Sequence, residues 1–479
     1  MHKKIANRLD MKIASILTNS FGTLFSRVTG LIRDILMASA LGASIYSDMF
    51  FVAFKLPNLF RRIFAEGAFT QAFMPSFVAS RHKGVFATAI LLRFLLFIIA
   101  GTLVVNIFPE AATKMMAIGW SDEVIAKTAP LTAINFWYLD LIFIVTFLAT
   151  LLQYKEHFAT TALSTALLNI SMVSALLYTM HDDPKRVAYA LSIAVVVGGI
   201  LQIIAHLITL YKLNLHPLII GGWRYRDKKD IESEKRGFTK LFIPAIWGNS
   251  TAQINSFIDT WLASFLGAGS ISYLFYANRV FQLPLAIFAI ATATALFPTV
   301  SKAIKNNQQE KAYQNLNRAF WLLTYALGFA MVGGIMLAEP IVWLLFERGN
   351  FTIESTQATI GVLTMYMVGL LPFGLAKLFS LFLYASHRQA KAAKIATYSL
   401  ITNMVASLTL MHPMGAAGLA LAGSIGGWVL FVFTVREVGS DRFIDMVKSI
   451  KSLYFVTAMM LFGILLHFVN LMLLGYIRQ

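Results

Sequence analysis

The sequence contains no cysteine, and it has few charged residues for a chain of 479 residues. The absence of cysteine excludes disulfide bonds, thiolate metal sites and cysteine nucleophiles. Charged residues make up 13% of the chain and hydrophobic residues 58%, and the mean hydropathy is +0.69. Apolar runs of roughly 20 residues recur along the whole chain, which is typical of a polytopic helical membrane protein. No soluble domain fits between these runs, because the longest polar stretch covers only about 214–236.

The chain also lacks the motifs of ATP-driven proteins and of metal-dependent enzymes. No segment matches the phosphate-binding loop GxxxxGK[ST], so any driving force must be ionic or electrical. The nine histidines are scattered and form no HExxH motif, which argues against an integral-membrane enzyme acting on lipid phosphates. The basic N-terminus leads into an apolar segment without an Ala-x-Ala cleavage site, so we expect a first transmembrane helix there rather than a signal peptide.

Thirteen apolar segments predict an all-α polytopic membrane protein. Basic residues gather in the loops on one side, which the positive-inside rule assigns to the cytoplasm together with the N-terminus. This asymmetry accounts for most of the net charge of +17, so we expect no nucleic-acid partner. The predicted spans lie near 12–41, 44–64, 85–108, 124–152, 158–180, 186–211, 241–266, 271–300, 313–338, 356–385, 390–411, 414–435 and 452–474.

An internal repeat organises these spans into two halves. The segment IRDILMASALGAS at 32–44 aligns without gaps on FIDTWLASFLGAG at 257–269, so Asp34 matches Asp259. Downstream, FFVAFK at 50–55 matches LFYANR at 274–279, so Lys55 matches Arg279. An even number of spans separates the two copies, which predicts two six-helix halves related by a pseudo-two-fold axis along the membrane normal. The substrate site is expected between the halves.

The repeat also sets the predicted domain boundaries. They are an N-terminal six-helix half at 1–212, a cytoplasmic basic linker at 213–237, a C-terminal six-helix half at 238–437 and one extra C-terminal helix at 438–479. In the linker, Trp223, Tyr225 and the flanking cations could lie on anionic lipid headgroups. A plain solvated linker explains the same composition equally well, and the sequence leaves both readings open.

Charged side chains concentrate in the apolar stretch from 25 to 75. The cations are Arg27, Arg33, Lys55, Arg61 and Arg62, and the anions are Asp34, Asp48 and Glu66. A charge facing lipid costs at least ~2.5–3.5 kcal/mol at the bilayer centre, so these side chains should face protein or a wet cavity. Because the cations outnumber the anions, internal pairing cannot neutralise them all, and an anionic substrate is expected to supply the missing charge.

Helical phase and chemistry refine this expectation. Arg27 and Asp34 should share one face of the first helix, with Arg33 turned about 120° away. In the second helix Arg62 can pair with Glu66 at i, i+4, and Pro57 should bend the helix near the charges. Guanidinium groups grip phosphate bidentately and stay charged in any environment, so a phosphate or pyrophosphate group is the expected ligand, on a lipid or on a soluble metabolite.

Four segments carry a family resemblance: SRVTGLIRD (26–34), SDMFFVAFKLPNLFRRIFAEGAFTQAFMP (47–75), SYLFYANRVFQLP (272–284) and LLFERGNFT (344–352). They resemble the MurJ/MviN lipid II flippases of the multidrug/oligosaccharidyl-lipid/polysaccharide exporter superfamily. The resemblance implies a transporter, not an enzyme, in the bacterial cytoplasmic (inner) membrane. It would move undecaprenyl-pyrophosphate-linked peptidoglycan precursor from the inner to the outer leaflet by alternating access. Many members have two helices after the twelve-helix core, whereas this sequence predicts one.

The resemblance also implies site residues. The essential cations of the family's central cavity fall on Arg27, Arg33, Arg61 and Arg279, and its acidic position falls on Asp48. The same motifs add a further set of predicted substrate-binding residues, which are Asp34, Lys55, Arg62, Glu66 and Ser272. The expected partners are lipid II and membrane lipids, and the protein is expected to act as a monomer.

Several alternatives stay open. The cargo could be another polyprenyl-linked oligosaccharide, or the protein could be a cation-coupled drug antiporter of the same fold, although the surplus of cations argues against drug export. No cofactor is expected, but coupling to a monovalent cation, Na⁺ or H⁺, is compatible with oxygen ligands at Asp259, Asn255 and Asn403. A packing role for Asp259 is the competing interpretation. A scaffold for the division or wall machinery would not require unpaired arginines inside the membrane.

Overall fold

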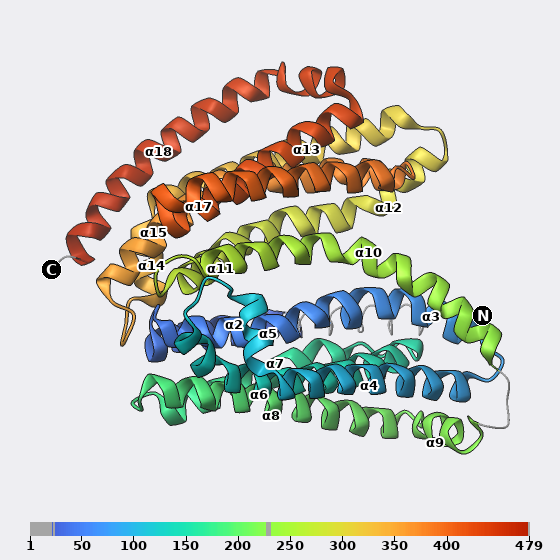
Figure 1. Ribbon diagram of the computed structural model, residues 1–479. Coiled ribbons are helices and arrows are strands. Elements are labelled where there is room, and N and C mark those ends of the chain that lie inside the picture. The colour runs from blue at the N-terminus through green and yellow to red at the C-terminus, as the bar shows by residue number, and fades with distance from the viewer. Residues whose placement is uncertain (1–21, 23, 227–230, 478–479) are drawn as a thin grey trace. The chain divides into compact units, whose positions relative to one another are not determined.

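The computed structural model is built from helices throughout its described residues (Figure 1). The structure describes residues 22, 24–226 and 231–477, and of these it leaves the side chains at 63–66, 247–252, 255 and 476–477 undescribed. The chain separates into two compact units, Met1–Trp261 and Leu262–Gln479. The all-α prediction is therefore confirmed. The domain boundaries predicted from the repeat remain a prediction.

The first unit contains a helix over 24–41 and the elements that follow it up to the boundary with the second unit. They are α2 (Ile45–Phe60), the π-helix η1 (Arg61–Phe69), α3 (Thr70–Ala79), α4 (Lys83–Ile107), α5 (Pro109–Met116), α6 (Asp122–Tyr154), α7 (Ala159–Thr179), α8 (Pro184–Lys212), α9 (His216–Arg224) and most of α10 (Glu232–Ala263).

The second unit repeats this order of elements. It contains α11 (Ser270–Pro284), the π-helix η3 (Leu285–Ile290), α12 (Ala291–Lys305), α13 (Gln309–Met336), α14 (Ala338–Phe346), α15 (Ile353–Val368), α16 (Leu370–Ala385), α17 (Gln389–Val447) and α18 (Ile450–Ile477). In each unit an α–π–α series is followed by one long helix and then by one short helix, α5 or α14. The duplication read from the sequence is thus confirmed in the architecture.

Each predicted span overlaps a helix in the described part of the chain, although residues 12–21 and 23 of the 12–41 span lie outside it. Among the described residues, nine helices are long and apolar enough to cross a membrane. One of them, α17, contains two predicted spans, because Gly415 breaks the helix with φ 58° and ψ −138°. The helices over 24–41, 45–79 and 232–263 do not count among the nine, and they contain most of the predicted site residues.

The second helix begins and is distorted at defined residues. Ser44 caps α2: its hydroxyl accepts a hydrogen bond from the Ser47 amide, and the Ser47 hydroxyl accepts one from the Ser44 amide. Pro57 lies inside α2 and has no amide hydrogen to donate, and the wider η1 begins at Arg61, four residues later. The distortion expected near Pro57 therefore takes the form of a π-helix. The second unit does the same, since η3 directly follows Pro284.

Aromatic packing holds the first unit together. Phe69 of η1 is fully buried, and its ring contacts Phe143 of α6 and Phe94 of α4 at centroid distances of 5.3 and 5.9 Å. Phe238 of α10 joins the same cluster, at 6.1 Å from Phe69 and 5.7 Å from Phe94. The π-helical segment is thus wedged among three long helices by large apolar side chains.

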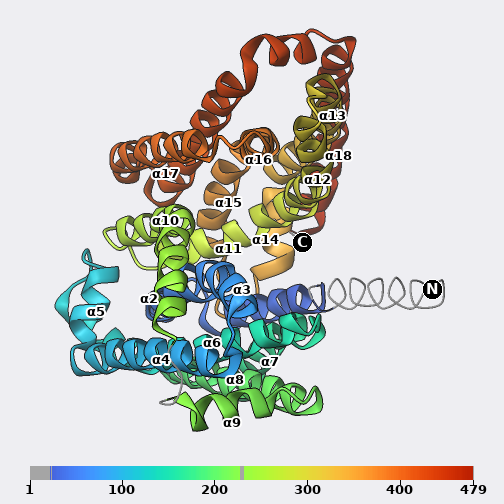
Figure 2. The same cartoon turned by 90° about the vertical axis from the view of Figure 1, so that its right-hand side faces the viewer.

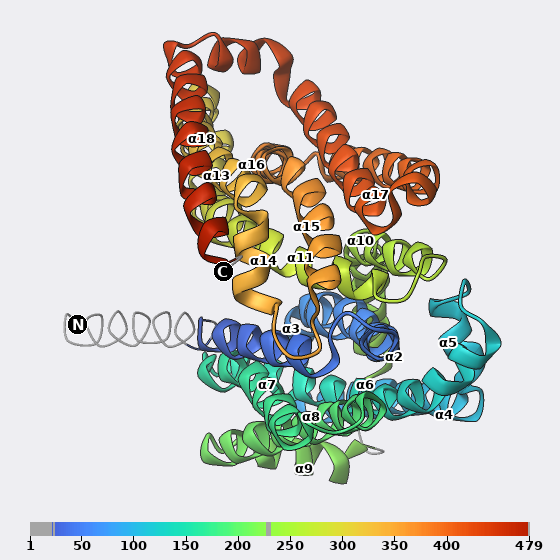
Figure 3. The ribbon, with the colours of Figure 1, turned by 90° about the vertical axis from the view of Figure 1, so that its left-hand side faces the viewer.

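In the second unit, α13 packs against both α16 and α18, and Figure 3 shows α18 running beside α13. A Cβ at Gly328 of α13 would lie 2.7 Å from the ring of Phe455 in α18, so the helices approach closely there. Only 6% of the apolar window of α18 is buried, as expected for a peripheral helix facing lipid. A single long helix, α18, follows α17 in the described chain, in line with the one extra helix predicted.

The short helix α9 packs against the beginning of α4, at the outer edge of the first unit (Figure 2). A Cβ added at Gly222 would lie 2.1 Å from the carbonyl oxygen of Gly84 and 2.2 Å from Oγ1 of Thr88. The Thr88 hydroxyl also donates a hydrogen bond to the Ile219 carbonyl at 3.4 Å. Only glycine at position 222 allows this backbone-to-backbone contact.

This contact can be tested with two neighbouring glycines. Gly222→Leu should overpack the α4–α9 contact, lower the free energy of unfolding by about 1–3 kcal/mol and expose the linker to protease. Gly221→Leu is the matched control, because a Cβ there meets no atom within 4 Å. Thermal unfolding and limited proteolysis of the detergent-solubilised protein would measure both effects. Equal behaviour of the two variants would contradict the packing described.

Candidate functional site

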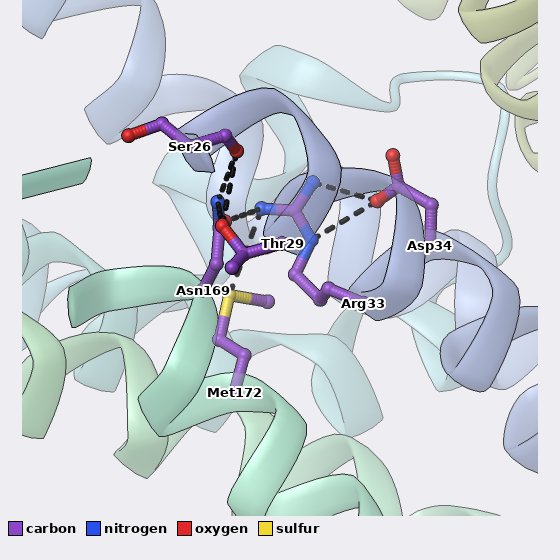
Figure 4. A network of polar contacts seen from close by, with 6 residues as sticks. All are labelled: Ser26, Thr29, Arg33, Asp34, Asn169 and Met172. Atoms are coloured by element: carbon purple, nitrogen blue, oxygen red, sulfur yellow. Dashed lines mark hydrogen bonds and ion pairs between the residues drawn. The ribbon is translucent and has the colours of Figure 1, made fainter. Parts of the chain in front are cut away.

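A buried arginine lies at the centre of the polar network of the first unit (Figure 4). Arg33, on the helix over 24–41, is 9% exposed, and its neighbour Asp34 is 2% exposed. The Arg33 Nη2 and Nε atoms donate to Oδ1 of Asp34 at 2.6 and 3.0 Å. The Nη1 atom donates to Oδ1 of Asn169 at 2.9 Å and approaches the Met172 sulfur at 4.0 Å. The guanidinium therefore faces protein and is satisfied by one carboxylate and one amide.

Asn169 of α7 connects this network to the backbone of the first helix. Its Nδ2 donates to the Ser26 carbonyl at 3.0 Å and to the Thr29 hydroxyl at 3.1 Å (Figure 4). The Asn169 amide therefore donates hydrogen bonds to one turn of the first helix and accepts one from Arg33 in the next turn of that helix. Because it is buried and bonded in both directions, Asn169 fixes the orientation of Arg33 relative to its own helix.

The charged residues of α2 have different surroundings. Asp48, in the first turn, is 1% exposed. Seven residues later, about two helical turns along α2, the partly buried Lys55 donates from Nζ to the Ser256 hydroxyl of α10 at 2.7 Å. At the start of η1, Arg61 donates from Nε and Nη2 to the Asn58 side-chain oxygen at 3.0 and 2.8 Å. Both cations therefore donate to neutral side chains of the same unit.

Two further cations of this unit are exposed. Arg27 lies six residues before Arg33 on the same helix, and Arg62 follows Arg61 in η1. The Glu66 side chain, predicted to pair with Arg62, lies outside the described residues. The unit thus contains both a guanidinium held by a carboxylate, at Arg33, and a guanidinium open to the surroundings, at Arg27.

The second unit contains the remaining predicted substrate ligands on α11. Ser272 is fully buried near the start of the helix. Arg279 is half-buried, and its guanidinium lies 4.6 Å from the centroid of the Phe275 ring, one turn earlier. Such a cation–π contact stabilises the charge without neutralising it.

The predicted cation ligands lie on two elements. Asp259 is partly buried on α10, and the Asn403 side chain on α17 is buried and accepts a hydrogen bond from Ser407 at 3.3 Å. The Asn255 side chain lies outside the described residues. No group of three or more His, Asp or Glu side chains gathers in the part of the chain that the structure describes. The monovalent-cation site therefore stays a prediction.

Sequence reasoning missed Asn169. The signal available was one amide inside the apolar stretch LLNISM of α7, but many buried asparagines serve only to pack. Its partner Arg33 lies 136 residues away, so no local spacing connects the two.

Similarity to known proteins identifies the family. The family model described as Lipid II flippase MurJ matches residues 37–477. The chain belongs to the lipid II flippase MurJ family. A probable lipid II flippase MurJ of Helicobacter pylori is 50% identical over 428 residues, covering 87% of this chain and 93% of the relative. The corresponding protein of Haemophilus influenzae is 32% identical, covering 84% of this chain and 81% of the relative.

Solved structures agree with the MurJ assignment. A lipid II flippase MurJ in an inward closed conformation superposes with a TM-score of 0.78 at 26% identity, covering 95% of this chain and 98% of that one. An inward-facing multidrug transporter of the MATE family gives a TM-score of 0.66 at 14% identity, covering 89% and 98%. The second match shows the shared fold alone. The predicted family and its two-lobed fold are both confirmed.

The role of Asn169 in this MurJ-family protein can be tested. Asn169→Leu leaves a buried guanidinium short of one acceptor and should cost about 1–3 kcal/mol of stability. It should also abolish complementation of a host that lacks its own MurJ, because Arg33 loses its fixed orientation. Asn135→Leu is the control, since the buried Asn135 joins α6 to Ser192 of α8 at 2.8 Å.

Thermal unfolding, protein level in the membrane and complementation should be measured together. Both variants should lose stability, but only Asn169→Leu should fail to complement at normal protein level. If both complement equally well, Asn169 has only a structural role.

Proposed function

We propose that this multi-pass membrane protein moves lipid II, the undecaprenyl-pyrophosphate-linked peptidoglycan precursor, from the inner to the outer leaflet. The observation that carries the proposal is the match of the lipid II flippase MurJ family model to residues 37–477. The substrate crosses the membrane without any covalent change, so the protein acts as a transporter and not as an enzyme. It works as a monomer among membrane lipids, with its N-terminus in the cytoplasm.

The pyrophosphate is bound by guanidinium groups from both halves of the repeat. We assign this role to Arg27, Arg33, Arg61 and Arg279, with Lys55 and Arg62 adding positive charge. A guanidinium presents paired N–H donors that match phosphate oxygens, and a site out of bulk water strengthens the attraction. The exposed Arg27 can engage an incoming phosphate directly. Arg33 can do so by exchanging Asp34 for the substrate, which keeps the guanidinium paired before and after binding.

The two halves alternate between inward-open and outward-open states while the polyprenyl chain stays in lipid. An empty cavity carries a net positive charge, and the inward-negative membrane potential acts on each charge with roughly 2.3 kcal/mol per 100 mV. The potential therefore favours the return of the empty cavity to the cytoplasmic side. Binding of Na⁺ at Asp259, Asn255 and Asn403, or of H⁺ at Asp259, would provide a second source of energy.

The arginine assignments predict a loss of function. Arg27→Ala, Arg33→Ala, Arg61→Ala and Arg279→Ala should each abolish complementation at normal protein level, because each removes a phosphate ligand that no other side chain replaces. Arg186→Ala is the matched control: Arg186 is exposed and forms only a surface ion pair with Asp182 at 3.3 Å. Growth supported by most of the four variants would rule out the pyrophosphate site.

The direction of transport predicts where the substrate accumulates. Depletion of the protein in its host should trap lipid-linked peptidoglycan precursor in the inner leaflet, and a leaflet-specific assay of the precursor measures this directly. Re-expression of the intact chain should restore the outer-leaflet pool. An unchanged distribution after depletion would refute the flippase function, whatever the arginine variants do.

A further inference from the structure

The linker between the halves contains an ordered helix at the end of a membrane span. The span α8 ends at Lys212, and the chain then turns through Asn214, whose φ is +52°. The Leu215 amide donates to the Leu210 carbonyl at 3.0 Å, which closes the last turn of α8. A new helix, α9, starts at His216 with Pro217 in its first turn. The chain therefore stays beside the bundle instead of running directly into the cytoplasm.

The depth of α9 follows from its packing on α4. At 1.5 Å per residue, the 25 residues of α4 span about 38 Å, which exceeds the ~30 Å hydrocarbon core of a bilayer. The first turn of α4 therefore lies near the headgroups. Gly222 of α9 is in backbone contact with Gly84 in that turn, so α9 is held at the level of the headgroups as well.

The face of α9 turned away from α4 combines apolar and cationic side chains. Ile220 is 61% exposed and Trp223 is 54% exposed, although both are large and apolar. Arg224 is exposed beside them, and the Arg226 guanidinium lies 4.8 Å from the centroid of the Trp223 ring. Exposed aromatic and aliphatic groups flanked by arginines are typical of a helix lying in the membrane interface.

An open groove of about 370 Å³ runs between α9 and the beginning of α4. Its apolar wall is formed by Val85, Pro217 and Leu218, and His82, Lys83 and Tyr225 also line it. The groove thus offers a cation and polar groups close to aliphatic surface. A phospholipid has the complementary structure, since a glycerol backbone joins its phosphate to apolar acyl chains.

Two acidic residues at the start of α10, within the part of the chain that the structure describes, are engaged by neighbouring groups. Glu234 accepts hydrogen bonds from the Ser80 hydroxyl at 2.6 Å and from the Arg81 amide at 3.2 Å. Glu232 lies 3.5 Å from the Lys235 ammonium and 3.7 Å from Nε of Arg236. Among the described residues, α9 and the beginning of α4 therefore present a positively charged surface, and a negatively charged partner complements it.

We propose that α9 and the beginning of α4 form a binding surface for anionic phospholipids of the cytoplasmic leaflet. Ile220 and Trp223 enter the interface, while Lys83, Arg224 and Arg226 contact the phosphates. A solvated linker would instead leave two large apolar side chains in water on a rigid helix. The surface fixes the linker between the two halves to the membrane, and it is independent of the pyrophosphate site.

The absence of cysteine from the chain makes a direct test possible. Ile220→Cys provides a unique site for an environment-sensitive thiol-reactive fluorophore, and Ser233→Cys, exposed in the first turn of α10, provides the control. The labelled full-length protein is placed in nanodiscs of phosphatidylcholine alone or of phosphatidylcholine with phosphatidylglycerol, without any lipid-linked precursor. Quenching is measured with a headgroup spin-labelled lipid and with aqueous acrylamide.

In discs containing phosphatidylglycerol, the label at 220 should shift to the blue, be quenched by the spin-labelled lipid and be protected from acrylamide. The label at 233 should remain open to acrylamide. Adding Arg224→Gln and Arg226→Gln should reduce the difference between the two disc types several-fold while the thermal midpoint stays unchanged. A label at 220 that is open to acrylamide in both discs would overturn the proposal. Equal lipid quenching in neutral and anionic discs would overturn its anionic part.

Discussion

The cost of placing a guanidinium among apolar helices is the constraint on which the arrangement of the first unit depends. Arg33 is buried, and its charge is balanced by Asp34 at 2.6 Å. Breaking a buried ion pair by removing one partner costs about 3–5 kcal/mol, because an uncompensated charge remains. The helix over 24–41 must therefore keep this face toward α7, where Asn169 completes the set of acceptors. One polar network thus fixes the rotation of a helix that otherwise presents mainly apolar side chains.

The other cations are held in a different way. Lys55 contacts the Ser256 hydroxyl, Arg61 the Asn58 amide and Arg279 the Phe275 ring. Contacts of this kind orient a cation through neutral groups of the protein. The backbone contributes as well, because η1 starts at Arg61 and its wider turn moves the following side chains out of α-helical phase. In the first copy of the repeat the departure from regular helix therefore coincides with charged residues, whereas η3 of the second copy is entirely apolar.

Most of the fold could be predicted from the sequence, because the relevant signals are local. Spans follow from runs of apolar residues, and the repeat follows from matching segments such as 32–44 and 257–269. The turn of η1 could not be predicted in the same way. A periodicity of 100° per residue places residues 62 and 66 on the same face of an α-helix, whereas a π-helix closes its turn at i+5. Proline marks the place of the distortion, at Pro57 and Pro284, but it does not determine its form.

In the candidate site, too, contacts between neighbours in sequence could be predicted and contacts between distant residues could not. Charge counting correctly places Arg33 against protein, since lipid would not tolerate it. Its pairing with Asp34 needs only adjacent residues, yet the choice of Asn169 as second acceptor depends on which face of α7 meets the first helix. Asn169 lies 136 residues away from Arg33 in sequence, so this choice depends on the tertiary arrangement of the two helices. The sequence can therefore show that a buried charge such as that of Arg33 needs hydrogen-bond acceptors. Only the tertiary fold determines which neutral side chain, here Asn169, is one of them.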